Sequence, residues 1–378
     1  MIIDGKRALA YSATIDNIQP IDGADRIELA FVKGWPIIVK KEEFQIGDLC
    51  VFFEIDSKLP EADWSEFLKD KHYKVKIYKL KKFGVISEGL ALPYSTFPED
   101  VRKNLPLFHD VDVTELLNVT YIEQEDNIRK SENNTNKKRN SFLMRYKWYR
   151  KLFCKKHHKK SNAFPTHFPY IKKTDEERVE NMPFLFSSNK INRYIVTEKL
   201  DGTSCTYILE RLRRNKFEFY VCSRNIRYKN IEQKTYHDFN IYWYLANKYE
   251  IRNCLENYLR EHKNLKYVCI QGEGVGKVQG NPLKLNEPDL YVFNFIDSEN
   301  GRYNAINGQE IINKMGMKWV PILDNSFVLP STLEELKIYS DGNSVINPNV
   351  LREGIVLRDI DTDFSFKSVS REYLLKHN

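Results

Sequence analysis

Short apolar runs with turn residues between them make up the first third of the chain. Gly47-Asp48 is typical of these turns, and polar and apolar residues alternate in Lys74-Val75-Lys76-Ile77, as they do in a strand with one face in solvent. Several short strands at this spacing predict a small β-barrel that carries two lysines on one strand face. The predicted strands are Ala8 to Ile15, Arg26 to Val32, Trp35 to Val39, Leu49 to Ile55, Tyr73 to Leu80 and Gly89 to Pro93.

The pattern changes after residue 176, where strand-like runs are separated by helical stretches and loops. The clearest helical period runs from Phe239 to His262 and has Trp243, Leu245 and Leu255 among its apolar positions. Strands and helices mixed in this way predict a second domain of the α+β class. Its predicted strands are Arg193 to Val196, Phe217 to Cys222, Tyr267 to Gln271, Leu290 to Ile296 and Gly354 to Leu357.

A basic segment without apolar periodicity in its first part, Asn127 to Lys160, lies between these two regions. Its first part is rich in asparagine, and its second part mixes aromatic residues such as Trp148 with basic ones such as Arg150, with Glu132 as its single acid. The mixture suits phosphates and stacked bases, and it equally suits a solvated linker or insertion with a short amphipathic helix. We therefore predict an N-terminal module over 1–116, a linker with a basic insertion over 117–175 and a second domain over 176–378.

Composition narrows the classes of protein that fit the chain. The formal net charge of +7 favours acidic partners, nucleic acid first. The six cysteines are scattered without a C-x-x-C pair, and no apolar run approaches the ~20 residues needed to span a bilayer. The N-terminal sequence lacks the charged-then-apolar order of a signal peptide. We expect a reduced intracellular protein, cytoplasmic or nuclear, that is a monomer and does not contact membranes.

Two familiar nucleotide-binding motifs fail in this sequence. The segment Gly272 to Val278 contains a Gly-Lys pair like that of a phosphate-binding Walker A loop. However, Gln271 stands where that motif needs its first glycine, and Val278 stands where it needs Ser or Thr. The dinucleotide pattern G-x-G-x-x-G fails too, because Lys277 occupies the position of its last glycine. Spacing also gives no Ser-His-Asp or Cys-His arrangement. Chemistry on ATP therefore needs another architecture.

Polar residues at the ends of predicted strands form an ordered series instead. Lys199-Leu200-Asp201-Gly202 resembles the K-x-D-G motif I of the covalent nucleotidyltransferases, the superfamily of polynucleotide ligases and messenger-RNA capping enzymes. One such match is weak evidence, but five companions follow it in the order of that superfamily. The companions are Ser223-Arg224-Asn225 (motif Ia), Gln271-Gly272-Glu273-Gly274 (motif III), Tyr291-Val292-Phe293 (motif IIIa), Glu353-Gly354-Ile355-Val356 (motif IV) and Phe366-Lys367 (motif V).

The N-terminal region carries a second resemblance, to the OB module of those RNA ligases that place it ahead of the nucleotidyltransferase domain. DNA ligases and capping enzymes carry their OB domain after motif V, where only 11 residues remain here. The resemblance implies an α+β protein, with an N-terminal OB-type β-barrel followed by an antiparallel-sheet nucleotidyltransferase domain. The stretches that carry it are Gly34-Trp35, Val39-Lys40-Lys41, Gly47-Asp48, Phe53 to Ser57 and Glu88 to Pro93.

Resemblance to this superfamily implies a reaction in three steps. A lysine attacks the α-phosphate of ATP, AMP passes to an RNA 5′-phosphate, and a 3′-hydroxyl displaces the AMP. Lys199 is the implied nucleophile, since an amine, unlike a guanidinium, can lose its proton. Nearby cations and a divalent metal would favour the neutral amine. Lys367 would stabilise charge on the α-phosphate, and Arg224 would contact the ribose or an RNA phosphate.

The resemblance also implies residues that bind the nucleotide and a metal. Tyr291 or Phe293 would stack on adenine, and Glu198 would contact its edge. Each residue alone also fits an ordinary role, as a surface charge or a core aromatic, and only the ordered set favours the site. Three carboxylates would hold the waters of Mg²⁺ or Mn²⁺, and the second of them is alternatively a ribose contact: Asp201, Glu273 and Glu353.

One position departs from the superfamily pattern. Many ligases have two lysines in motif V, and Ser365 occupies the earlier lysine position here. The second phosphate contact must then come from elsewhere, and Lys173 or a lysine of the OB module is a candidate.

We therefore predict an ATP-dependent RNA ligase that joins 3′-hydroxyl and 5′-phosphate RNA ends at nicks in duplexes. Its cofactors would be ATP and Mg²⁺ or Mn²⁺, and its OB module would grip RNA beside the nick. One alternative is a GTP-dependent mRNA capping guanylyltransferase, which the domain order disfavours. The other is a non-catalytic RNA-binding protein that retains the fold, and the intact set of Lys199, Glu273, Glu353 and Lys367 argues against it.

Overall fold

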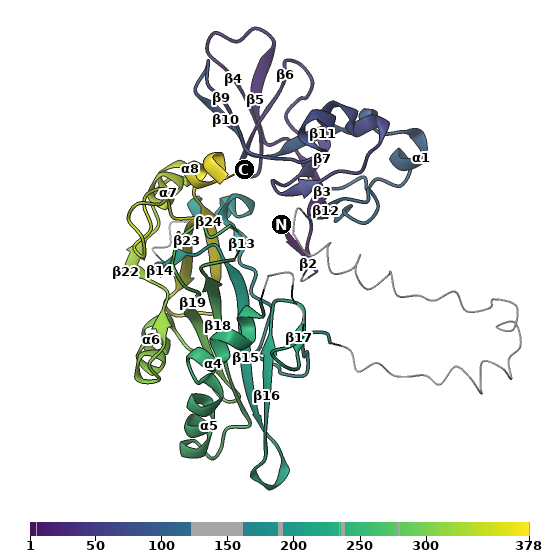
Figure 1. Cartoon of the computed structure of the whole chain (residues 1–378). Coiled ribbons are helices and arrows are strands. Elements are labelled where there is room, and N and C mark those ends of the chain that lie inside the picture. The colour runs from purple at the N-terminus through teal and green to yellow at the C-terminus, as the bar shows by residue number, and fades with distance from the viewer. Residues whose placement is uncertain are drawn as a thin grey trace, which may run out of the picture.

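The structure is a computed structural model that describes residues 1–4, 6–121, 162–187, 192–233, 235, 239–278 and 280–377. The chain forms an N-terminal lobe and a larger C-terminal lobe that meet at one junction (Figure 1). The predicted basic insertion, 127–160, lies outside the described residues. Within the described ranges, no helix is long and apolar enough to cross a membrane.

Short antiparallel strands and two apolar clusters make up the N-terminal lobe. Strand β7 contributes to both clusters, because successive side chains of a strand point to opposite sides: Phe52 joins one cluster and Phe53 the other. Strand β12 still pairs with β8, so the lobe includes Tyr121. The strands are β1 (Ile2–Ile3), β2 (Lys6–Arg7), β3 (Ala10–Thr14), β4 (Asn17–Pro20), β5 (Ile27–Val32), β6 (Trp35–Lys40), β7 (Leu49–Phe53), β8 (Ser57–Lys58), β9 (Tyr78–Leu80), β10 (Val85–Ser87), β11 (Leu90–Pro93) and β12 (Thr120–Tyr121). The helices are η1 (Asp63–Lys71), η2 (Tyr94–Thr96) and α1 (Glu99–Arg102).

Two sheets form the C-terminal lobe. One has five strands in the order β13-β24-β23-β14-β22, and the other runs β17-β16-β15-β18-β19-β20 with β21 beside β19. Among the described strands of this lobe, the pairings are antiparallel except β13 with β24 and β19 with β21. The strands are β13 (Glu177–Arg178), β14 (Arg193–Lys199), β15 (Thr203–Arg211), β16 (Phe217–Cys222), β17 (Arg227–Tyr228), β18 (Tyr267–Val275), β19 (Asp289–Asp297), β20 (Gly301–Arg302), β21 (Lys318–Trp319), β22 (Ile322–Val328), β23 (Gly354–Asp359) and β24 (Ser365–Val369). The predicted class, an OB-type barrel followed by an antiparallel-sheet domain, is confirmed.

Helices cover the larger sheet and close its core. Leu245 of α4, Leu255 of α5 and Ile312 of α6 are fully buried in one cluster with strand residues such as Ile270. The remaining helices connect strands or line the junction. The helices are η4 (Val179–Asn181), η5 (Pro183–Phe186), η6 (Arg213–Asn215), α4 (Ile241–Lys248), α5 (Ile251–Glu261), α6 (Ala305–Lys314), α7 (Leu333–Ser340) and α8 (Arg371–His377).

Two predicted elements differ from the structure. The helix predicted over Phe239 to His262 is two helices, α4 and α5, because Glu250 takes a left-handed φ of 46°. The strand predicted over Tyr73 to Leu80 is limited to β9, since His72 and Tyr73 have φ values of 54° and 60° that turn the chain. The helices α4 and α5 still face one core, whereas Val75 and Ile77 belong to the two different apolar clusters of the N-terminal lobe.

Motif I lies where the two sheets separate. Lys199 is the last residue of β14 in the five-stranded sheet, and Thr203 is the first of β15 in the seven-stranded sheet. Gly202 between them must be a glycine, because a Cβ there would collide with the carbonyl oxygen of Gly274. This close approach fixes Lys199 and Asp201 at the mouth between the sheets.

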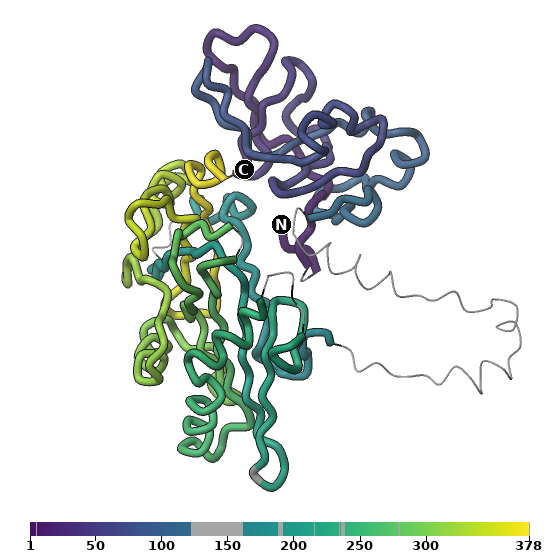
Figure 2. Tube along the Cα trace, viewed as in Figure 1, coloured from purple at the N-terminus to yellow at the C-terminus, as the bar shows by residue number. Residues whose placement is uncertain are grey.

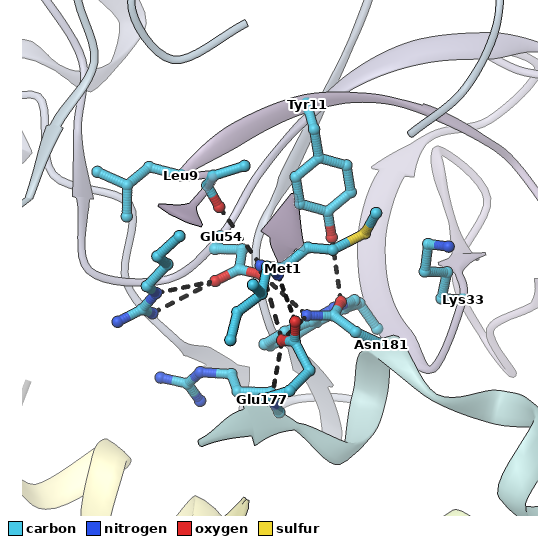
Figure 3. A network of polar contacts seen from close by, with 12 residues as sticks. Met1, Leu9, Tyr11, Lys33, Glu54, Glu177 and Asn181 are labelled. Atoms are coloured by element: carbon cyan, nitrogen blue, oxygen red, sulfur yellow. Dashed lines mark hydrogen bonds and ion pairs between the residues drawn. The ribbon is translucent and has the colours of Figure 1, made fainter. Parts of the chain in front are cut away.

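A half-buried amide joins the two lobes. Asn181 accepts hydrogen bonds at Oδ1 from Trp35 Nε1 (2.7 Å) and Tyr11 Oη (3.2 Å), both from the N-terminal lobe. Its Nδ2 donates to Glu54 (3.1 Å) and to Glu177 (2.7 Å), as Figure 3 shows. All donor and acceptor sites of this side chain are therefore used. We call this network the Asn181 clasp.

A second polar contact at the junction involves a buried lysine. Lys337 is 1% exposed, and its Nζ donates to Glu180 (2.5 Å) and to the carbonyl of Val369 (2.9 Å). The carbonyl of Glu180 in turn accepts a hydrogen bond from the backbone of Gly34 in the N-terminal lobe (2.8 Å). The orientation of the lobes is thus fixed by buried, directional bonds as well as by apolar packing.

Candidate active site

A cavity of about 590 Å³ opens at the junction of the lobes. Every residue predicted for the site lines it except Tyr291. The N-terminal lobe contributes a second wall, which includes Arg7, Asp56 and Tyr121. The predicted residues that the cavity gathers are Glu198, Lys199, Asp201, Arg224, Glu273, Phe293, Glu353 and Lys367.

Lys199 is paired with a carboxylate in this cavity. Its Nζ lies 2.5 Å from Glu353 Oε1, and Asp201, two positions away, is not its partner. Burial lowers the pKa of Lys199, but the carboxylates of Glu353 and Glu273 outweigh burial and leave the pKa raised. Without nucleotide or metal, Lys199 is therefore an ammonium group, and the neutral amine expected from the sequence requires a further change in the site.

The carboxylates around Lys199 lack sufficient cationic partners. Burial, with help from Glu353 and Asp201, raises the pKa of Glu273 to about 8, and burial likewise raises the pKa of Glu353. Glu353 Oε2 is buried without a hydrogen-bond partner. No group of three or more His, Cys, Asp or Glu side chains among the described residues is placed to hold a metal directly. The unpaired oxygen of Glu353 and the raised pKa values of Glu273 and Glu353 fit a divalent cation at the three carboxylates, and Mg²⁺ usually keeps several of its own waters.

Motifs Ia and V meet at a carboxylate that no motif contains. Asp175 accepts an ion pair from Arg224 (3.1 Å) and another from Lys367 (3.1 Å), and both cations hold its pKa below the usual range against the effect of burial. Burial lowers the pKa of Lys367 to about 8. Asp175 thus supports two cations that point into the cavity, and its position in an irregular segment left no pattern by which to find it.

The cavity is also lined by an aromatic side chain and a buried acid. Glu198 is 2% exposed, and its Oε2 accepts a hydrogen bond from the backbone of Val345 (2.9 Å), whereas Oε1 has no partner. Burial raises the pKa of this carboxyl. Phe293 lines the same cavity. Tyr291 does not line it, and Lys318 Nζ lies 5.6 Å from its ring centroid. Of the two aromatic candidates, only Phe293 lines the cavity.

Comparison with known proteins decides the family. An OB-fold domain model matches residues 9–94, and an RNA ligase model matches residues 192–369. The structure of Naegleria gruberi RNA ligase with pyrophosphate is 32% identical, with a TM-score of 0.74, over 98% of this chain and 99% of that chain. The chain belongs to the RNA ligase family.

Other structures of the Naegleria gruberi enzyme are equally similar to this RNA ligase. A lysine-to-alanine variant with ATP and manganese is 31% identical with a TM-score of 0.73, and a lysine-to-methionine variant with AMP and manganese is 32% identical with a TM-score of 0.74. Both alignments cover 98% of this chain and 99% of that chain. No match was found among curated proteins.

The missing motif V lysine of this RNA ligase is not replaced by Lys173. Lys173 Nζ donates to Asn225 (2.8 Å) and does not line the cavity, and Ser365 Oγ donates to Glu176 (2.6 Å). Other cations line it instead. They are Arg7, Lys74 and Lys76 of the N-terminal lobe and Arg178 and Arg358 of the C-terminal lobe. The sequence predicted an OB-module lysine as an alternative, and Lys74 and Lys76 fit that description, whereas no motif marked the arginines.

Replacing Glu273 with glutamine is expected to stabilise this RNA ligase at alkaline pH when nucleotide and metal are absent. The pKa of Glu273 is raised from 4.5 to about 8, so between these values the folded protein keeps a proton that the unfolded chain has released. Stability contributed by this group therefore falls as pH rises through that window. The variant's advantage should be near zero at pH 5 and reach ~1–2 kcal/mol above pH 8, because cavity water screens part of the charge. Thermal unfolding with EDTA across this range measures it, and a pH-independent difference would contradict the assignment.

Proposed function

We propose that this RNA ligase seals 3′-hydroxyl and 5′-phosphate RNA ends at breaks in duplexes, with ATP and Mg²⁺ or Mn²⁺, through a lysyl-AMP intermediate on Lys199. The observation that carries the proposal is the placement of Lys199, Glu353 and Lys367 in one cavity at the end of β14. Structures of the Naegleria gruberi enzyme with ATP and manganese, and with AMP and manganese, support the choice of nucleotide and metal.

The first step joins Lys199 to AMP. The ammonium group first passes a proton to an acceptor, and Glu353 is placed for this at 2.5 Å. The amine then attacks the α-phosphorus, the bond to the bridging oxygen breaks, pyrophosphate leaves, and the second proton goes to solvent. When bound, a divalent cation neutralises phosphate charge and disfavours the ammonium form of the lysine. Asp201, Glu273 and Glu353 would hold it through its waters.

Two further transfers complete the reaction. An RNA 5′-phosphate oxygen attacks the lysyl-AMP phosphorus, the nitrogen–phosphorus bond breaks, and Lys199 recovers a proton. The 3′-hydroxyl then loses its proton and attacks the RNA 5′-phosphorus, and AMP leaves. Lys367 and Arg224 would stabilise phosphate charge in these steps, because both are cations that line the cavity. Phe293 and Glu198 would contact adenine.

The experiment that tests the proposal follows label from nucleotide to protein. The protein is incubated with Mg²⁺ and either α-labelled ATP or α-labelled GTP, denatured, and examined for covalent label. We expect label from ATP, and its release when a nicked duplex with a 5′-phosphate is added. Label from GTP alone would favour a capping guanylyltransferase, and no label from either would favour a non-catalytic RNA-binding protein. Sealing of single strands in preference to nicked duplexes would overturn the substrate assignment.

A row of lysines supports RNA binding on the N-terminal lobe. Lys74 and Lys76 line the cavity, and the row continues with three exposed lysines on the β9–β10 hairpin. Val75 and Ile77 are buried, whereas Lys76 between them is exposed. We define the hairpin lysines as Lys79, Lys81 and Lys82.

Replacing the three hairpin lysines with alanine is expected to weaken binding of nicked duplex RNA without reducing label transfer from ATP. Each lost phosphate contact lowers the slope of log affinity against log salt by about 0.9 for a duplex, so the slope should fall by about 2–3. Filter binding at several salt concentrations measures it. The control replaces three exposed lysines of the far end of the C-terminal lobe, Lys263, Lys266 and Lys314. An equal loss in both triple variants would mean that net charge, and not this row, is responsible.

A further inference from the structure

Asp201, the carboxylate of motif I, is held by a residue that no motif contains. Tyr373 Oη donates a hydrogen bond to Asp201 Oδ2 at 2.5 Å. Tyr373 is 6% exposed and lines the same cavity as Lys199. Because Lys199 bonds to Glu353 instead, the orientation of Asp201 is set from the C-terminal helix α8 and not from its neighbour in the sequence.

Helix α8 is itself fixed to both lobes. Arg371 donates to Glu88 of the N-terminal lobe (2.6 Å) and to Glu334 of the C-terminal lobe (2.6 Å). Leu374, next to Tyr373, is buried in the apolar cluster that contains Phe52 of the N-terminal lobe. Figures 1 and 2 show α8 at the junction, against the N-terminal lobe. The tyrosine is therefore carried by a short helix whose position depends on how the lobes dock.

The backbone of Tyr373 is also held in place by hydrogen bonds. Its amide donates to Ser370 Oγ (3.1 Å), and that hydroxyl donates to Asp341 (2.6 Å). The first turn of α8 is thus capped through a buried serine, and the ring has little freedom. A fixed donor on Oδ2 limits the orientations of the Asp201 carboxylate, which lines the same cavity as Glu273 and Glu353.

We propose that Tyr373 is a positioning residue for the divalent cation: it fixes the Asp201 carboxylate, and α8 makes that orientation depend on the docked N-terminal lobe. The proposal rests on the proposed function, because the cation is the one that ATP chemistry would use. Partners that orient a metal-binding carboxylate from outside typically contribute 10–100-fold to metal affinity or activity, so an effect of about this size is expected. Tyr373 would contact neither the nucleotide nor the cation.

The test measures metal binding directly. Tyr373→Phe and the wild-type protein are titrated with Mn²⁺ in the presence of AMP, and free Mn²⁺ is followed by electron paramagnetic resonance. We expect the variant's dissociation constant for Mn²⁺ to rise by about 10-fold or more, with AMP affinity in EDTA unchanged within about twofold. The Mg²⁺ concentration that gives half-maximal label transfer should rise in parallel, whereas the maximal rate at saturating Mg²⁺ should change less.

A matched control removes the same kind of bond elsewhere. Tyr303 Oη donates to Asp297 at 2.7 Å, and neither residue lines the cavity of Lys199. Tyr303→Phe should leave Mn²⁺ binding unchanged. Equal effects of the two variants, or an unchanged dissociation constant in Tyr373→Phe, would overturn the proposal.

A second variant tests the link to the N-terminal lobe. Arg371→Gln keeps Tyr373 but removes the charged bond to Glu88 and should also raise the dissociation constant for Mn²⁺, by less than Tyr373→Phe does. An unchanged dissociation constant for Mn²⁺ in Arg371→Gln would show that the orientation of Asp201 does not depend on the docked N-terminal lobe. Absence of label transfer in the wild-type protein would contradict the proposed function alone, since Mn²⁺ binding is read without turnover.

Discussion

Replacing Lys199 with alanine is expected to abolish covalent label from ATP, because no other group among the described residues combines an amine with this position. Lys199→Arg should fail as well, since a guanidinium does not lose its proton at neutral pH. Loss of the nucleophile removes the intermediate itself, so the rate should fall by about 10³-fold or more, to the detection limit. Denaturing electrophoresis after incubation with α-labelled ATP measures it.

The matched control for this variant is Lys173→Ala. Lys173 lies outside the cavity and bonds to Asn225, so its loss should leave labelling near the wild-type level. Isothermal titration of both variants with ATP would show that the cavity still binds nucleotide. Label that persists in Lys199→Ala would assign the nucleophile elsewhere.

Replacing Lys367 with alanine is expected to slow label transfer by about 10²–10³-fold, the usual cost of removing one preorganised donor from developing charge. Lys367 is 7% exposed and paired with Asp175, so its charge acts where little water screens it. Its pKa is lowered to about 8, so it is charged below that pH and loses its charge above it.

Lys367→Arg supplies the control, because arginine keeps its charge across the whole range. We expect the ratio of the arginine variant's kcat/KM to the wild-type value to rise with pH above about 8, as the wild-type lysine loses its proton. Single-turnover labelling from pH 6.5 to 9.5 measures this ratio, in which the titration of Lys199 cancels. A ratio that stays flat would mean that Lys367 keeps its proton in the free enzyme and that burial is not what tunes it.

The sequence predicted the class of fold and most of the cavity because the relevant residues sit at strand ends within short motifs. Lys199 ends β14, Glu353 immediately precedes β23 and Glu273 lies near the end of β18, so the arrangement of the sheets brings them together. Tyr291 shows the limit of such reasoning. It belongs to the same motif as Phe293, but its side chain does not line the cavity, and Lys318 lies beside its ring.

The residues that the sequence did not reveal contact partners that are far away along the chain. Asp175 meets Lys367, and Tyr373 meets Asp201, through folding of the whole chain and not through spacing. The break between α4 and α5 was missed for a different reason. Leu245 and Leu255 keep the helical period across Glu250, so a single left-handed residue leaves the apolar pattern intact.

The Asn181 clasp limits how this protein can be divided into separate lobes by truncation. A fragment that lacks the N-terminal lobe would leave the amide of Asn181 without three of its four bonds, and Glu180 without the Gly34 donor. Unpaired polar groups of this kind cost about 1–3 kcal/mol each where they stay buried, and water would enter where they do not. If a truncated fragment is inactive, the cause would therefore be either destabilisation at the surface that the N-terminal lobe normally covers or the loss of an RNA contact, and the experiment would not separate the two. Point substitutions in the full-length chain are therefore the better way to assign a function to either lobe.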